Sequence, residues 1–175
     1  RLWNKLNSSR VGLEICAMAG AEAVIRTFGA IRGTEPQHMS KTRCYVAWGK
    51  NPKATNIHSH VLSKDIHPTI VVDPYRSESA KVADLYIQPR PASDPVLAMA
   101  LMRLLIERGW ADEEFLSNHT SGYDAVRAKV METGLAAAAD ICGVPAADIE
   151  QFAELYALNT PALIHIGVGL QRNSN

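Results

Sequence analysis

Short runs of strand-forming residues alternate along the chain with longer segments in which apolar residues recur at helical spacing. The strand-forming runs lie at about 43–47, at Thr69–Val72, at 84–88 and at 162–166. Helical spacing is found from 11 to about 31, at 53–65, at 95–107 and throughout 111–158. This alternation predicts an α/β fold, a Rossmann-like three-layer sandwich with a mostly parallel sheet. Residues of about 111–158 then form a helical insertion before the fourth strand.

The order of the four predicted strands locates a possible binding site. Right-handed crossovers and the usual doubly wound arrangement predict the order 3-2-1-4. The order reverses between the first and fourth strands, and ligands bind there, beyond the carboxyl ends. The turns at this point are Gly49-Lys50-Asn51-Pro52 and Gly167-Val168-Gly169, while the other strand ends offer Asp73 and the loop 90–94. Such an edge, glycine-rich or polar at every strand end, is typical of a nucleotide site.

The first of these turns joins a strand to the predicted start of a helix at Pro52. This arrangement presents backbone N–H groups and a helix N-terminus to an anionic ligand. The turn does not match GxGxxG, so a plain Rossmann domain for NAD is the least favoured reading.

Each candidate residue at the strand ends also has a purely structural reading. Asp94 precedes Pro95 and could be a helix N-cap, whereas Asp73 before Pro74 could form a turn. The other structural readings are tight turns for Gly167 and Gly169, surface cations for Arg76 and Arg172, and packing for Trp48.

Composition and charge narrow the classes of partner. The chain has 175 residues, of which 47% are hydrophobic and 21% charged, and its formal net charge is +0. Without a run of Lys or Arg, binding to nucleic acid or to an anionic membrane surface is not expected. No apolar stretch reaches the roughly 18 to 20 residues of a membrane-spanning helix, so direct membrane insertion is not expected either.

The chain opens on Arg1 and stops at Asn175, shortly after a glycine turn. We therefore expect a fragment of a longer protein, with residues 1–40 as a helical lead-in and 41–175 as a dinucleotide-binding α/β domain. The sequence does not distinguish a cytoplasmic from a periplasmic protein, because the three cysteines show neither zinc spacing nor a disulfide framework.

Four motifs in succession carry a family resemblance. They are Trp48-Gly49-Lys50-Asn51-Pro52 with Thr55, Asp73-Pro74-Tyr75-Arg76, Arg90-Pro91-Ala92-Ser93-Asp94, and Gly167-Val168-Gly169-Leu170-Gln171-Arg172. With these motifs in this order, the chain resembles the molybdopterin oxidoreductases of the dimethyl sulfoxide reductase family. The resemblance implies a bis(molybdopterin guanine dinucleotide) cofactor that carries molybdenum or tungsten.

The resemblance also implies roles for individual residues. Gly49 and Asn51 would approach the pyrophosphate, Asp73 would bind the ribose or guanine, and Ser93 with Asp94 would read the guanine edge. A carboxylate suits guanine because it accepts hydrogen bonds from two adjacent N–H groups. The full set of expected cofactor-binding residues is Trp48, Gly49, Asn51, Thr55, Asp73, Pro74, Arg76, Ser93, Asp94, Gly167, Gly169, Gln171 and Arg172.

Cys16 is the candidate metal ligand and catalytic residue. From the residues alone it is either a small buried hydrophobe or a thiol that the helix N-terminus favours as thiolate. The family's ligand lies shortly before a helix that leads to Phe-Gly, and Cys16 precedes Phe28-Gly29 in that way. The residue after it is Ala17, where some family members have His.

The resemblance implies redox or oxygen-atom transfer on a small-molecule substrate in the full-length protein, with the fragment itself inactive. It also implies a [4Fe-4S] cluster in an amino-terminal part outside this chain and further domains, and it allows an iron–sulfur subunit as partner. The alternative is a pterin-free scaffold or electron-transfer subunit of a respiratory complex that keeps the same fold.

Overall fold

A computed structural model describes residues 5, 18–31 and 33–171 of the chain. The chain divides into two compact units, residues 1–33 and 34–175, which we describe separately. In the first unit, helix α2 spans Met18–Phe28 and ends at Gly29, whose φ of 77° is left-handed. This agrees with the predicted helix over its described part, since Gly29 stops the helix as a C-terminal glycine does.

The second unit is built on a parallel four-stranded sheet in the order β3-β2-β1-β4. The strands are β1 (Cys44–Trp48), β2 (Thr69–Val72), β3 (Leu85–Ile87) and β4 (Ala162–Ile166). Both the strands and the order 3-2-1-4 are therefore confirmed. In the register, Trp48 lies opposite Val72 on one side and Ile166 on the other, so these three strands end at the same level.

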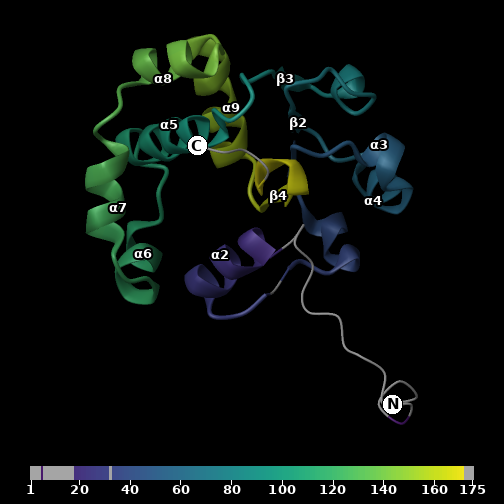
Figure 1. Ribbon diagram of the computed structural model, residues 1–175, viewed down its shortest axis with the longest axis horizontal. Helices are drawn as coiled ribbons and strands as arrows, with labels where there is room; N and C mark the ends of the chain where they lie inside the picture. The colour runs from purple at the N-terminus through teal and green to yellow at the C-terminus, as the bar shows by residue number, and fades with distance from the viewer. Residues whose placement is uncertain (1–4, 6–17, 32, 172–175) are drawn as a thin grey trace. The chain divides into compact units, whose positions relative to one another are not determined.

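One face of the sheet is covered by the long helices (Figure 1). These are α5 (Asp94–Glu107), α8 (Leu135–Cys142) and α9 (Ala146–Leu158). The buried residues on this face include Val46, Ile70 and Leu97, together with Phe152 from α9. A nearly all-apolar α5 belongs in this position because it packs against the sheet, α8 and α9.

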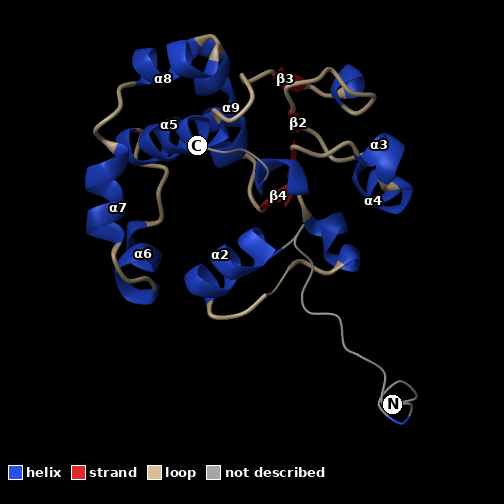
Figure 2. Ribbon diagram, viewed as in Figure 1, coloured by secondary structure: helices blue, strands red, loops and turns tan. Residues whose placement is uncertain are grey.

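The opposite face is covered by shorter elements, so that helices lie on both sides of the sheet (Figure 2). They are η1 (Pro36–Lys41), α3 (Pro52–Thr55), α4 (Ile57–Ser63) and η2 (Ala80–Val82). Tyr45, Ala47 and Val71 of the sheet form the core here with Met39 and Ala80. The α/β fold with a mostly parallel sheet is thus confirmed.

One predicted helix is wrong in its extent. The single helix expected over residues 53–65 is two helices, α3 and α4, because Asn56 interrupts it with a φ of −150°. The Asn56 side chain accepts a hydrogen bond from the Ser59 backbone N–H over 3.1 Å and so begins α4. Asparagine favours this capping position over the interior of a helix.

The predicted helical insertion is confirmed. After α5 it contains α6 (Glu113–His119) and α7 (Tyr123–Val130), then α8 and α9, before β4 and the final η3 (Val168–Gln171). Along the part of the chain that the structure describes, none of the helices has the length and apolar character needed to cross a membrane.

Candidate functional site

The hydrogen bonding of the sheet continues one residue past the ends of its strands. The Gly167 N–H donates to the Trp48 carbonyl and the Gly49 N–H to the Val72 carbonyl, both over 2.8 Å. The Asp73 N–H donates to the carbonyl of Ile87 over 3.1 Å. The first residue after each of three strands is therefore fixed against the neighbouring strand, at the edge where the sequence predicts a site.

Two glycine turns meet between β1 and β4, where the strand order reverses. A Cβ atom on Gly167 would lie 1.8 Å from the Gly49 carbonyl oxygen, a distance that no side chain can occupy. Gly49 itself has a φ of +60°, which disfavours any other residue. Both glycines are thus required by the fold, so the structural reading of Gly167 holds whether or not it also approaches a ligand.

A cavity of about 180 Å³ opens beside these turns at the carboxyl ends of the strands. Its lining residues come from all four strand ends: Gly49, Asp73, Pro74, Pro91, Ala92, Asp94, Gly169 and Leu170. The strand ends therefore converge on one cavity, as the strand order predicts. Five of the expected cofactor-binding residues lie in it, namely Gly49, Asp73, Pro74, Asp94 and Gly169.

Asp94 is held in this cavity by Trp48. The Trp48 indole N–H (Nε1) donates to Asp94 Oδ1 over 2.7 Å, while the Trp48 ring packs on Phe152 at 5.8 Å between centroids. Asp94 is the first residue of α5, and the N-cap position belongs to Ser93. The N-cap reading of Asp94 is therefore wrong, and the packing reading of Trp48 holds together with a polar role.

Asp73 faces the same cavity from the end of β2. Its Oδ1 accepts the Tyr75 backbone N–H over 2.9 Å, and its carbonyl accepts the Tyr86 hydroxyl at the same distance. Burial raises the pKa of Asp73, the Tyr75 N–H opposes that rise, and the negative charge of Asp94 adds to it. The cavity thus presents two carboxylates, which suit a ligand with N–H or O–H donors.

The loop between β3 and α5 is braced by the insertion. Arg90 Nη1 donates to the carbonyls of Asp140 and Ile141, and the Arg90 N–H donates to Cys142 at the end of α8 over 2.8 Å. Ser93 is 6% exposed, and its hydroxyl donates to the Arg90 carbonyl over 2.7 Å. Because that hydroxyl serves the loop itself, the structure leaves Asp94 as the better-placed group toward a ligand.

Asn51 and Thr55 lie outside the lining of this cavity. The Asn51 Oδ1 accepts from the Ser79 hydroxyl over 2.8 Å and from the Ser79 N–H over 3.2 Å. This pair of bonds ties the turn after β1 to the loop after β2. The exposed Thr55 hydroxyl donates back to the Asn51 carbonyl over 2.9 Å. In the described chain both residues shape the turn.

Arg76 lies in an adjoining cavity of about 570 Å³. Its guanidinium carbon is 5.8 Å from the centre of the Tyr86 ring, an arrangement that holds the cation over the aromatic face. Pro74 and Pro91 line both cavities, so the two adjoin. Arg76 thus lines the cavity that adjoins the predicted site and is absent from the lining of the predicted site itself.

The structure does not describe the side chains of three expected residues. The backbone of Gln171 lies in η3, while its side chain, Arg172 and the candidate metal ligand Cys16 lie outside the described residues. Within the residues that are described, no group of three or more His, Cys, Asp and Glu side chains could hold a metal ion.

Sequence reasoning missed three residues that line the cavity: Pro91, Ala92 and Leu170. Ala92 has a φ of 70°, a left-handed conformation that is uncommon without glycine and often marks a functional loop. No sequence signal distinguishes such an alanine. Leu170 lies against Gly49, since a Cβ on Gly49 would be 3.4 Å from Leu170 Cγ, and only the folded turn brings the two residues together.

Comparison with known proteins finds relatives of the chain. No protein-family model matches the chain. The probable oxidoreductase YoaE of Bacillus subtilis (strain 168) is 30% identical over 179 residues, covering 100% of this chain and 26% of YoaE. The probable dimethyl sulfoxide reductase chain YnfF of Escherichia coli (strain K12) is 30% identical over 195 residues, covering 95% of this chain and 24% of YnfF.

A solved structure shares the fold. Acetylene hydratase from Pelobacter acetylenicus matches with a TM-score of 0.78 at 24% identity, over 88% of this chain and 22% of that one. The chain spans about a quarter of the length of these two curated relatives. From its motifs, its fold and these relatives, the chain belongs to the molybdopterin oxidoreductases of the dimethyl sulfoxide reductase family.

Proposed function

We propose that this chain binds one guanine dinucleotide arm of a bis(molybdopterin guanine dinucleotide) cofactor in a full-length molybdenum or tungsten oxidoreductase. The observation that carries the proposal is the cavity at the carboxyl ends of the strands, which Asp73 and Asp94 enter from two different loops. When bound, the cofactor supplies redox or oxygen-atom-transfer chemistry at its metal, and the residues of this chain hold its nucleotide end.

The carboxylates fit a guanine. A guanine presents an N–H and an adjacent NH₂ on one edge, and a carboxylate accepts from both at once. Asp94 is oriented for this task because Trp48 holds one of its oxygens over 2.7 Å. A purine without these donors would form no such pair of hydrogen bonds with a carboxylate, so the site would discriminate guanine from adenine.

The glycine turns fit the remainder of a dinucleotide. Gly169 lines the cavity without a side chain, which lets a phosphate group approach the backbone of this turn closely. In this proposal Gly49 and Asn51 lie near the pyrophosphate, Asp73 near the ribose or guanine, and Arg76 in the adjoining cavity toward a further part of the cofactor. Cys16 as metal ligand belongs to the same proposal.

The proposal is tested on the full-length protein, expressed with molybdate. Acid release of GMP, pterin fluorescence after oxidation and elemental analysis are measured for wild type, Asp94→Asn and a control, Asp124→Asn, from the first turn of α7. We expect the wild type to carry molybdenum, pterin and GMP. Asp94→Asn, which loses one acceptor for guanine, should retain about tenfold less GMP after equilibration.

Each alternative gives a different result. A full-length protein that folds but carries neither metal nor pterin contradicts the proposal and favours the pterin-free scaffold. Retention of the cofactor by Asp94→Asn at the level of Asp124→Asn would remove Asp94 from the guanine site. Cys16→Ala addresses the metal separately, because loss of molybdenum with retained GMP identifies a ligand to the metal.

A further inference from the structure

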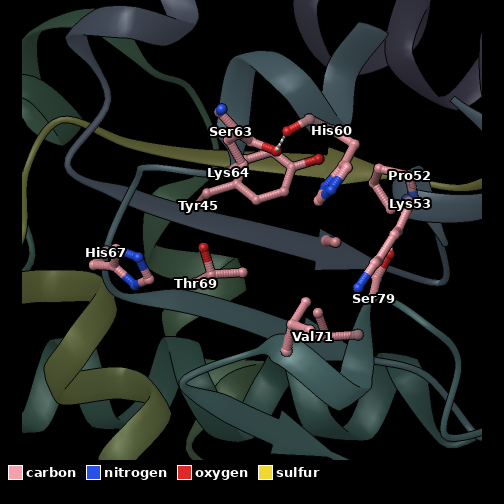
Figure 3. Close-up of a pocket in the computed structure, with 12 residues that line it drawn as sticks. Tyr45, Pro52, Lys53, His60, Ser63, Lys64, His67, Thr69, Val71 and Ser79 are labelled. Atoms are coloured by element: carbon pink, nitrogen blue, oxygen red, sulfur yellow. Dashed lines mark hydrogen bonds between the residues drawn. The ribbon is translucent and has the colours of Figure 1, made fainter. Parts of the chain in front are cut away.

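A second cavity, of about 200 Å³, lies on the face of the sheet that α3 and α4 cover (Figure 3). Its floor is formed by Tyr45 and Ala47 of β1 and by Thr69 and Val71 of β2, and α4 lies over it. None of the residues that line it also lines the cavity at the strand ends. The two cavities are therefore separate, and a ligand in the second one does not depend on the proposed cofactor site.

The Lys and His side chains that line this second cavity are not balanced by acidic ones in the lining. Its lining includes Lys53, His60, Lys64 and His67, whereas none of the described residues that line it is Asp or Glu. His67 is already paired, since its Nδ1 lies 2.7 Å from Asp84 Oδ2. The part of the chain that the structure describes offers Lys53 and Lys64 no ion-pair partner within 4.0 Å. An anionic ligand would supply the missing partner.

Glu78, the acidic side chain whose charge interacts with that of Lys53, does not fill this role. The positive charge of Lys53 contributes to the lowered pKa of Glu78, but the larger causes are the hydrogen bond and charge of Lys81. Glu78 Oε1 lies 2.5 Å from Lys81 Nζ, in an exposed pair outside the cavity lining. Lys53 thus remains available to a ligand.

The hydroxyl groups in the cavity are already committed to the protein. Ser63 donates to the Ser59 carbonyl over 2.8 Å and Thr69 to the Ile66 carbonyl over 2.7 Å. Ser79 donates to Asn51 Oδ1 over 2.8 Å. A bound anion must therefore meet the lysine and histidine side chains, of which Lys53 lies in α3 and His60 in α4.

The floor between these polar groups is apolar. Ala47 and Val71 are each 1% exposed, and Pro52 and Val82 complete the apolar lining. In Figure 3, Lys53 and Ser79 lie at one end of the cavity, Thr69 and His67 lie at the other, and Val71 lies between them. A ligand that fills this space needs a hydrocarbon body as well as a charge, which an inorganic ion lacks.

We propose that this cavity is a second ligand site, which binds a small organic carboxylate with its charged group at Lys53 and its apolar body against Ala47 and Val71. His60, which lines the cavity from α4, adds a second donor to the carboxylate. Its lining shares no residue with the strand-end cavity, so the proposed occupant is a molecule other than the guanine nucleotide.

Calorimetric titration of the full-length protein at low ionic strength tests the inference, with sodium benzoate as probe and neutral benzamide as its isostere. We expect benzoate to bind at least about tenfold more tightly than benzamide, since only benzoate forms the ion pair. Lys53→Gln should weaken benzoate about tenfold and leave benzamide unchanged. Lys129→Gln is the matched control, because Lys129 is exposed and paired with Glu132 on the insertion.

The inference is overturned by equal affinities for benzoate and benzamide, or by the absence of benzoate binding at about 10 mM. It is also overturned if Lys53→Gln binds benzoate as the wild type does. Should Lys53→Gln fail to fold, His60→Gln takes its place, and weakened benzoate binding with unchanged benzamide binding is again the supporting result.

Discussion

The Trp48 indole nitrogen and Asp94 Oδ1 are 2.7 Å apart, and this hydrogen bond joins the last residue of β1 to the first residue of α5. Its donor belongs to a side chain that is 7% exposed and packed on Phe152. A carboxylate that faces a ligand cavity is thus oriented by a buried ring.

Replacing Trp48 by Phe separates the two roles of this ring. The phenyl ring keeps much of the packing on Phe152, but Asp94 loses its donor. We expect a stability loss of about 1–3 kcal/mol in urea unfolding and a larger fractional loss of bound GMP than the stability change explains. Trp110→Phe is the control, because no side-chain hydrogen bond of Trp110 is found among the described residues. Unchanged GMP retention in Trp48→Phe would show that Asp94 needs no such support.

Gly167→Ala is expected to destabilise the chain by more than about 3 kcal/mol. The new Cβ would lie 1.8 Å from the Gly49 carbonyl oxygen, so the turns after β1 and β4 would have to separate. Gly33→Ala serves as control, because a Cβ there meets nothing within 4 Å. Its stability should stay within about 0.5 kcal/mol of the wild type. A wild-type melting temperature for Gly167→Ala would contradict the close contact of the two turns.

The raised pKa of Asp73 predicts a pH dependence of stability. Because the pKa in the folded state lies above the ordinary value of 3.8, the folded protein holds this proton more tightly than the unfolded chain. The stabilising contribution is therefore present below about pH 3.8 and is lost as pH rises through the folded-state pKa. Asp73→Asn removes this loss of stability at higher pH, while its amide oxygen can still accept the Tyr75 N–H.

We thus expect Asp73→Asn to gain stability over the wild type as pH rises from 3 to 7, by a margin that grows through the titration of Asp73. Urea unfolding across this range measures the difference between the two proteins. The same variant should bind the guanine nucleotide more weakly, because a carboxylate acceptor is lost. A stability difference that does not vary with pH would show that Asp73 titrates normally.

Arg90→Met should affect the cofactor site through the loop that Arg90 braces. The variant loses the donors to the Asp140 and Ile141 carbonyls, which hold the loop of Ala92 and Asp94 against α8. Arg103→Met is a matched control, since Arg103 Nη1 likewise donates to two insertion carbonyls, those of Met131 and Thr133. We expect similar losses of stability, about 1–3 kcal/mol each, and reduced GMP retention in Arg90→Met alone. Equal GMP retention in both variants would limit Arg90 to a role in folding.

Much of the fold could be predicted from the sequence because the strands are short, apolar and separated by clear helical patterns. The β-branched run Thr69–Val72 is a strand with the predicted bounds, and the strand order follows from the handedness of the crossovers. The break at Asn56 was missed because helical spacing continues across it. The two helices are evident from the backbone of Asn56 and from its side chain, which accepts the Ser59 N–H and caps α4.

The site was less predictable, because residue type does not determine where a side chain points. Asp73 and Asp94 follow directly from strand ends, and both reach the cavity. Ser93 and Asn51 carry equally suitable polar groups, but their oxygens bond to Arg90 and Ser79 instead. Ala92 could not be found in advance, since its left-handed backbone is imposed by the folded loop.

The hydrogen bonds that run past the strand ends make the floor of the strand-end cavity part of the sheet. The amides of Gly49, Asp73 and Gly167 each donate to the last residue of a neighbouring strand, so none can reach bulk solvent without local opening. Their hydrogens should therefore exchange for deuterium as slowly as those of the sheet, unlike the amides of ordinary surface loops. A nucleotide that arrives there finds a surface already rigid, and little conformational entropy remains to be lost when it binds.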